Sequence, residues 1–126
     1  MPNRTEVEEA LAEIEADMRR MLVPDSARFD LAWNIWSKSM SLASESPDLM
    51  HPLWLIWGAL TDWVELRPEE STQAEATMVR ASTEWLAIPK ADSHGRTAYL
   101  DRWVYDEMGY ERHPVDPGGA ADGGGT

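Results

Sequence analysis

The sequence contains no cysteine, and this absence removes several chemistries at once. Disulfides, thiolate nucleophiles, iron–sulfur clusters and cysteine-ligated zinc all require that side chain. A chain of 126 residues can bury roughly two-thirds of the surface that its unfolded form exposes. We therefore expect one domain, with a core that needs neither a metal nor a disulfide to fold.

Long apolar runs are also missing from the sequence. The longest one, residues 53–60, falls well short of the roughly 20 residues of a membrane-spanning helix. The first residues are acidic, whereas an export signal combines a basic stretch with an apolar run. The sequence therefore predicts a soluble, cytoplasmic protein that has no membrane partner.

Positive charge is scarce, because 11 lysines and arginines stand against 23 aspartates and glutamates, for a formal net charge of −12. A field of this sign repels phosphate backbones and speeds the encounter with basic proteins, so nucleic-acid binding is not expected. High net charge also serves solubility alone, which leaves a basic protein partner and simple solubility as equal alternatives. Arginine outnumbers lysine nine to two, a bias typical of GC-rich coding sequence and of a bacterial or phage source.

Apolar residues recur with the period of an α-helix, and no segment alternates as a β-strand does. Prolines and capping residues divide this pattern, with a capping box at Thr5 and Glu8 and a C-terminal cap at Gly109. Gly95 argues against a helix inside the polar stretch between residues 88 and 97. Five helices are predicted, over about 6–22, about 26–44, from between 46 and 52 to 66, from 68 to 88, and from about 97 to 109.

These helices predict an all-α fold, a single-domain bundle or orthogonal array of four to five amphipathic helices over residues 1–112. The helix ending at residue 66 is expected to be the central one. Residues 113–126 are rich in glycine, proline and aspartate without apolar periodicity, and they are predicted to be a disordered tail.

Tryptophan is the most unusual component, with seven copies against a single phenylalanine. Each indole buries a large area, and its N–H needs an acceptor, so tryptophan suits cores, interfaces and ligand pockets. Trp54 lies off the main apolar stripe, between Thr61 and Glu65 on a helical projection, as an exposed anchor or packed against a neighbouring turn. The remaining candidates lie on predicted core faces, namely Trp36, Trp57, Trp63, Trp85 and Trp103.

The predicted second helix carries two apolar stripes, so both sides of it must be contacted, by neighbouring helices or by another chain. The first stripe contains Phe29, Ala32, Trp33, Trp36, Met40 and Ala43. The second stripe, together with part of the third helix, is the predicted partner-binding surface, formed by Leu31, Ile35, Leu42, Trp54 and Leu55.

Signals for catalysis or for a cofactor are weak. Phosphate loops, dinucleotide fingerprints, nucleophile elbows and histidine-based metal motifs are missing, so no catalytic residue, cofactor or metal is predicted. His94, beside Asp92 and near Arg96, is the one candidate base. Carboxylates could also meet across helices to hold a cation, although acids are so common here that a solvated face explains them equally; they are Asp62, Glu65, Asp101, Asp106 and Glu107.

The sequence therefore ranks three functions. The first is a non-enzymatic acidic protein that docks on a larger, basic protein or on itself, such as an accessory subunit or an immunity or inhibitor-type protein. The second is a small-molecule-binding module with an apolar pocket lined by tryptophan and methionine. The third is an enzyme with a site around His94.

Overall fold

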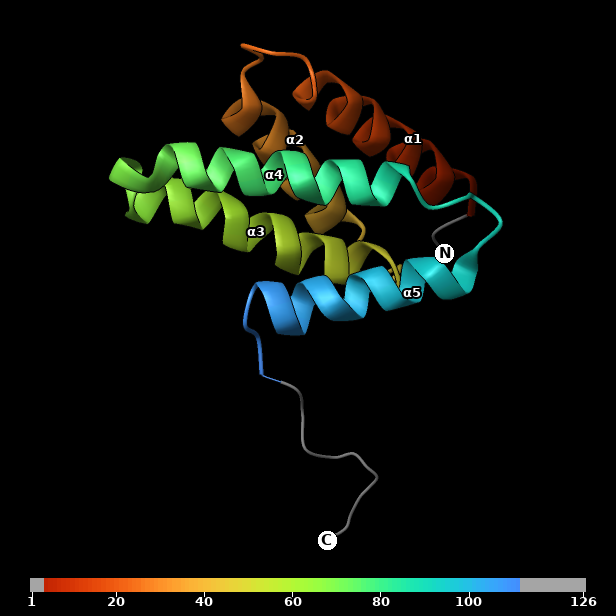
Figure 1. Ribbon diagram of the computed structural model, residues 1–126. Coiled ribbons are helices and arrows are strands. Elements are labelled where there is room, and N and C mark those ends of the chain that lie inside the picture. The colour runs from red at the N-terminus through yellow and green to blue at the C-terminus, as the bar shows by residue number, and fades with distance from the viewer. Residues whose placement is uncertain (1–3, 112–126) are drawn as a thin grey trace, which may run out of the picture.

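The computed structural model describes residues 4–111, and within them every regular element is helical (Figure 1). This confirms the predicted all-α fold of packed helices, while the predicted tail at 113–126 lies outside the described residues. The elements are α1 (Arg4–Met21), α2 (Arg28–Ser41), α3 (Met50–Leu66), the 3₁₀ turn η1 (Pro68–Glu70), α4 (Ser71–Leu86), α5 (Ser93–Asp101) and the π-helix η2 (Arg102–Glu107) that continues α5.

The first four helices form a closed ring of neighbours. α1 packs on α2 and α4, and α3 packs on the same two helices from the opposite side. α5 and η2 then lie against α3, as the lowest helix in Figure 1. α3 therefore contacts α2, α4, α5 and η2, which makes it the central helix, as its apolar sequence predicts.

The start of α5 differs from the prediction of a loop that extends to residue 97. The side chain of Asp92 accepts a hydrogen bond from the backbone N–H of Gly95 at 2.8 Å and caps a helix that begins at Ser93. A Cβ atom at Gly95 would collide with this carboxylate. Gly95 thus makes room for the cap and does not break the helix.

The buried face of α2 also differs from expectation, because it consists of Ala32, Ile35 and Ser39. Trp33 and Met40, from the stripe with the larger residues, remain 42% and 43% exposed. Small side chains at 32 and 39 allow close packing, and the Ser39 hydroxyl is satisfied by donating to the Ile35 carbonyl at 2.8 Å. Ile35 therefore lies in the core, and its prediction as part of an exposed partner-binding surface is wrong.

The core also holds indole groups whose N–H atoms are paired with glutamates. Trp85 Nε1 donates to the buried Glu15 carboxylate at 2.9 Å, and Trp103 Nε1 donates to Glu84 at 3.0 Å. Trp57 is fully buried, and its Nε1 is the one buried side-chain polar atom of residues 4–111 that has no hydrogen-bond partner. Two buried tryptophans of equal size thus differ in whether their N–H is satisfied.

This difference predicts unequal costs for the same substitution. Trp85→Phe and Trp57→Phe remove the same atoms, but only Trp85→Phe takes a donor from a buried carboxylate. We expect Trp85→Phe to lower the free energy of unfolding by about 1–3 kcal/mol more than Trp57→Phe does. Urea unfolding of both variants measures the difference, and equal losses would show that the Trp85–Glu15 hydrogen bond contributes nothing.

Candidate functional site

One face of α3 is left partly open between α2 and the α5–η2 segment. His51, Leu55, Gly58, Asp62 and Glu65 recur at intervals of four and three residues, so they line one side of the helix. Each of the five is exposed or half-buried. We call this face, with the side chains that flank it, the α3 groove.

The part of the groove next to α2 is a hollow of about 360 Å³ that we call the aromatic hollow. The Trp33 and Trp36 rings have centroids 4.7 Å apart and meet at 42°. A Cβ atom at Gly58 would stand 3.2 Å from the Trp36 ring, so the missing side chain allows this indole to lie on α3. The described lining consists of Trp33, Trp36, Trp54, Leu55, Gly58, Thr61, Asp62, Glu65 and Tyr110.

The part next to α5 and η2 is a second hollow, of about 500 Å³, that we call the acidic hollow. Its apolar floor includes Leu55, Leu100 and Val104, and carboxylates stand among the residues around it. The described lining consists of Pro47, Asp48, His51, Pro52, Leu55, Thr97, Leu100, Asp101, Val104, Tyr105, Tyr110 and Glu111.

Tyr110 lies between the two hollows and lines both. Gly109 has a φ of +80°, and the Tyr110 N–H then bonds the Val104 carbonyl at 3.1 Å, which reverses the chain after η2. The Tyr110 hydroxyl donates to the Leu55 carbonyl on α3 at 3.3 Å. Burial and the negative charge of Asp62 both raise the pKa of this phenol above its ordinary value.

The electrostatics of the groove have one sign. Its described lining includes the carboxylates of Asp48, Asp62, Glu65, Asp101 and Glu111 and no lysine or arginine. A concave surface of this composition attracts cations, and its aromatic faces add cation–π attraction.

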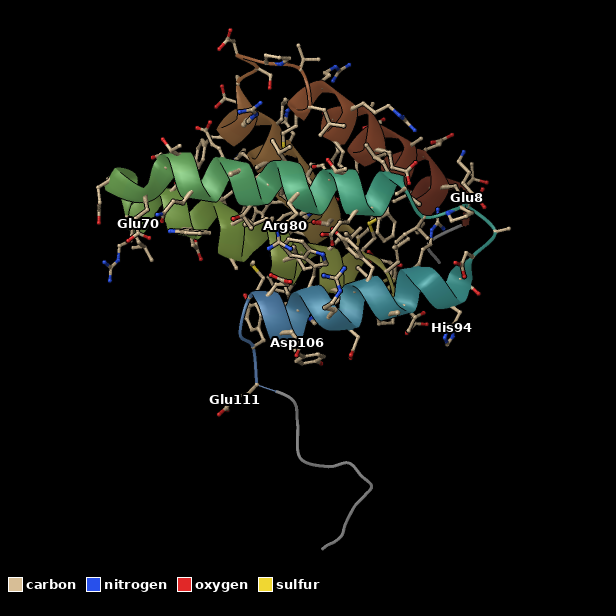
Figure 2. All side chains as sticks on the ribbon, in the orientation of Figure 1. Glu8, Glu70, Arg80, His94, Asp106 and Glu111 are labelled. Carbon is tan, nitrogen blue, oxygen red and sulfur yellow. The ribbon has the colours of Figure 1, made fainter. Side chains whose placement is uncertain are left out.

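The wall of the groove formed by α5 and η2 is tied to α4 by two arginines and two glutamates. Arg102 contacts Glu84 at 2.7 Å, and Arg80 contacts Glu107 at 2.8 Å. Figure 2 shows Arg80 reaching from α4 toward this segment, and its guanidinium lies 4.6 Å from the centroid of the Trp103 ring. Arg102 and Glu107, five residues apart, meet at 3.4 Å because the π-helix is wider than an α-helix.

These contacts shift the pKa of both carboxyls. Burial by itself would raise the pKa of Glu84, but hydrogen bonds from Arg102 and Trp103 and the nearby positive charges outweigh it, so the pKa is lowered. The pKa of Glu107 is lowered mainly by its hydrogen bond from Arg80. Both carboxylates are therefore held in the charged form in the folded protein.

The predicted partner-binding residues separate in the structure. Trp54 and Leu55 line the groove, and Thr61 and Glu65, the neighbours of Trp54 on the helical projection, line the same hollow. Leu31 and Leu42 are half-buried and pack against the core, outside the groove. Sequence reasoning missed three groove residues, because Trp33 and Trp36 were assigned to an apolar stripe and Tyr110 follows the cap at Gly109.

The residues of the enzyme hypothesis do not converge on one point. His94 is exposed at the outer end of α5 (Figure 2), while Asp92 caps that helix. Arg96 turns inward, 3.9 Å from Glu15 and 5.3 Å from the centroid of the Trp85 ring. Within residues 4–111, no three histidine, aspartate or glutamate side chains are grouped so that they could hold a metal ion, so the carboxylates of α3 and η2 form no such cluster.

Comparison of the chain with protein-family models, curated proteins and solved structures finds no match. Among the described helices, none has the length and apolar character that crossing a membrane requires.

The lowered pKa values of Glu84 and Glu107 predict how stability depends on pH. A carboxyl whose pKa is lower in the folded state contributes stability above its unfolded pKa, near 4.3 for an ordinary glutamate, and loses it as the pH falls through the folded value. We expect the free energy of unfolding to fall less steeply below about pH 4.3 in the double variant Glu84→Gln/Glu107→Gln than in the wild type.

Urea unfolding between neutral and acid pH measures this slope. The double variant Glu45→Gln/Glu69→Gln makes the same charge change at exposed positions outside the network and should keep the wild-type slope. Parallel curves for all three proteins would contradict the contribution of the network.

Gly109 provides a second test of how the groove is built. The space around it is open, so a Cβ atom meets nothing and only the positive φ is costly. We expect Gly109→Ala to lower the free energy of unfolding by about 1 kcal/mol, and Gly109→Asn to cost less because asparagine tolerates this conformation better. Urea unfolding compares the two, and an alanine variant as stable as the wild type would contradict the strained turn.

Proposed function

We propose that the protein is a non-enzymatic binding protein that docks on a larger protein partner through the α3 groove. The observation that carries this proposal is the open face of α3, where aromatic rings and Leu55 lie among carboxylates and the described lining has no lysine or arginine. The segment that fits such a groove carries apolar side chains together with positive charge.

The aromatic residues of the groove support a protein partner. Trp33 is 42% exposed and Tyr110 is 39% exposed, although both have large apolar surfaces whose burial is favourable. Tryptophan and tyrosine are also the residues that most often dominate binding energy in protein interfaces. The groove thus combines an anchor surface with a rim of acids that selects for basic partners.

A pair of leucine variants tests the proposal. Leu55→Arg puts a positive charge into the middle of the groove, whereas Leu66→Arg puts the same charge at a side chain that is 78% exposed and lines neither hollow. The two variants and the wild type serve as baits for affinity purification from the native source, followed by mass spectrometry. We expect one protein to be enriched by the wild type and by Leu66→Arg and to be lost with Leu55→Arg.

Calorimetry with that purified protein then measures direct binding, which should weaken with rising salt because the attraction is electrostatic. Equal capture by both variants would contradict a role of the groove. Sedimentation covers self-association, since a wild-type dimer that Leu55→Arg converts to a monomer would make a second copy, and not a larger protein, the partner.

The acidic hollow favours a second candidate, the binding of a small molecule. Its volume of about 500 Å³ lies within the range of about 300–1,000 Å³ typical of ligand sites. Tryptophan emission of the isolated protein, titrated with small cationic aromatic compounds, distinguishes this function. A saturable change that Leu55→Arg abolishes would support it, and unchanged emission would leave the protein partner as the function.

A further inference from the structure

The aromatic hollow has a more specific composition than the groove as a whole. Three indoles and a phenol surround it, from Trp33 and Trp36 on α2, Trp54 on α3, and Tyr110 after η2. Trp33 stays largely exposed beside Trp36, so its ring face is available to a ligand. At about 360 Å³ the hollow is near the lower limit of small-molecule sites, a size that suits the end of one side chain.

Two carboxylates stand at the edge of these rings. Asp62 and Glu65 are one turn apart on α3, both are exposed, and neither forms an ion pair with another described residue. The charge of Asp62 reaches the ring of Tyr110, where it contributes to the raised pKa of the phenol. Aromatic faces and acceptor oxygens therefore meet in one small volume.

This combination distinguishes between possible ligand groups. An anion would be repelled by both carboxylates, and a neutral apolar group would leave them without a partner. A quaternary ammonium uses the ring faces but donates no hydrogen bond to the carboxylates. A guanidinium is planar, stacks on aromatic rings, is weakly hydrated and donates a fork of N–H groups to carboxylates.

We propose that the aromatic hollow takes the guanidinium group of an arginine side chain that the partner protein inserts between Trp33, Trp54 and the carboxylate of Asp62. This inference rests on the proposed function and names the group that is recognised. The arginine is the anchor of the basic segment, and the acidic hollow takes the apolar residues that flank it.

Defined peptides test the assignment with the full chain. The probe is a synthetic amphipathic peptide of leucine, alanine and lysine with one central arginine, and its three relatives carry citrulline, lysine or trimethyl-lysine in place of that arginine. Calorimetry measures the affinity of each. We expect citrulline, which keeps the shape but loses the charge, to weaken binding about ten-fold, as for the loss of one cation–π contact and one charge-assisted hydrogen bond.

Protein variants locate the effect. Trp33→Leu and Asp62→Asn should each weaken binding of the arginine peptide several-fold and leave the citrulline peptide unchanged. Glu69→Gln removes one negative charge outside the hollow and should change neither affinity. Urea unfolding of Trp33→Leu confirms that each comparison is made between folded proteins.

Several results would overturn the assignment. They are equal affinity for the arginine and citrulline peptides, tighter binding of the trimethyl-lysine peptide, no binding of the arginine peptide at low salt, or no effect of Trp33→Leu and Asp62→Asn. A several-fold gain in affinity on Arg112→Gln would make the chain's own Arg112 the occupant and would likewise overturn assignment to a partner. None of these results decides the proposed function, which is judged by partner capture with Leu55→Arg.

Discussion

The indole N–H group sets the constraint that organises this bundle. A tryptophan can fill a helical core only if its N–H finds an acceptor there, and three of the tryptophans find a glutamate. Trp85 with Glu15 joins α4 to α1, Trp103 with Glu84 joins η2 to α4, and Trp63 donates to Glu70 at 2.7 Å between α3 and η1. Each of these bonds connects different elements, so the same residues that supply apolar area also fix the relative positions of the elements.

The excess of acid consequently has two separate causes. Some carboxylates belong to the interior, such as Asp17, which is almost fully buried and bonded to Lys38 of α2 at 3.0 Å. Lys38, Arg80 and Arg102 are engaged in such internal pairs. With these cations used to hold helices together, the face of α3 keeps its negative charge without compensation from lysine or arginine in its described lining.

Periodicity and capping residues predict the helices themselves well, since α1, α3 and α4 begin and end close to the expected positions. The orientation of α2 is not predictable in this way, because both of its stripes are apolar and the deciding factor is the close approach allowed by Ala32 and Ser39. The start of α5 was wrong because Gly95 has the composition of a loop, while its actual role is to accommodate the Asp92 cap.

The candidate site was predictable only in part. A helical projection already places Trp54 beside Thr61 and Glu65, and all three line the aromatic hollow. The other wall depends on tertiary structure, since Trp33 reaches the hollow only once α2 is oriented. Tyr110 reaches it only because the chain reverses at Gly109. Side chains brought together by packing and by a reversal have no common sequence signal.

The π-helix η2 makes the groove sensitive to the number of residues and not only to their identity. A π-helical turn accommodates an additional residue, and each residue of an α-helix advances the chain by about 100° and about 1.5 Å. Loss of one codon within 102–107 would let the segment return to regular α-helix and would rotate everything that follows away from α3. Insertions and deletions, more than point substitutions, are therefore the kind of sequence variation that could reshape this surface between related chains while the four-helix ring stays intact.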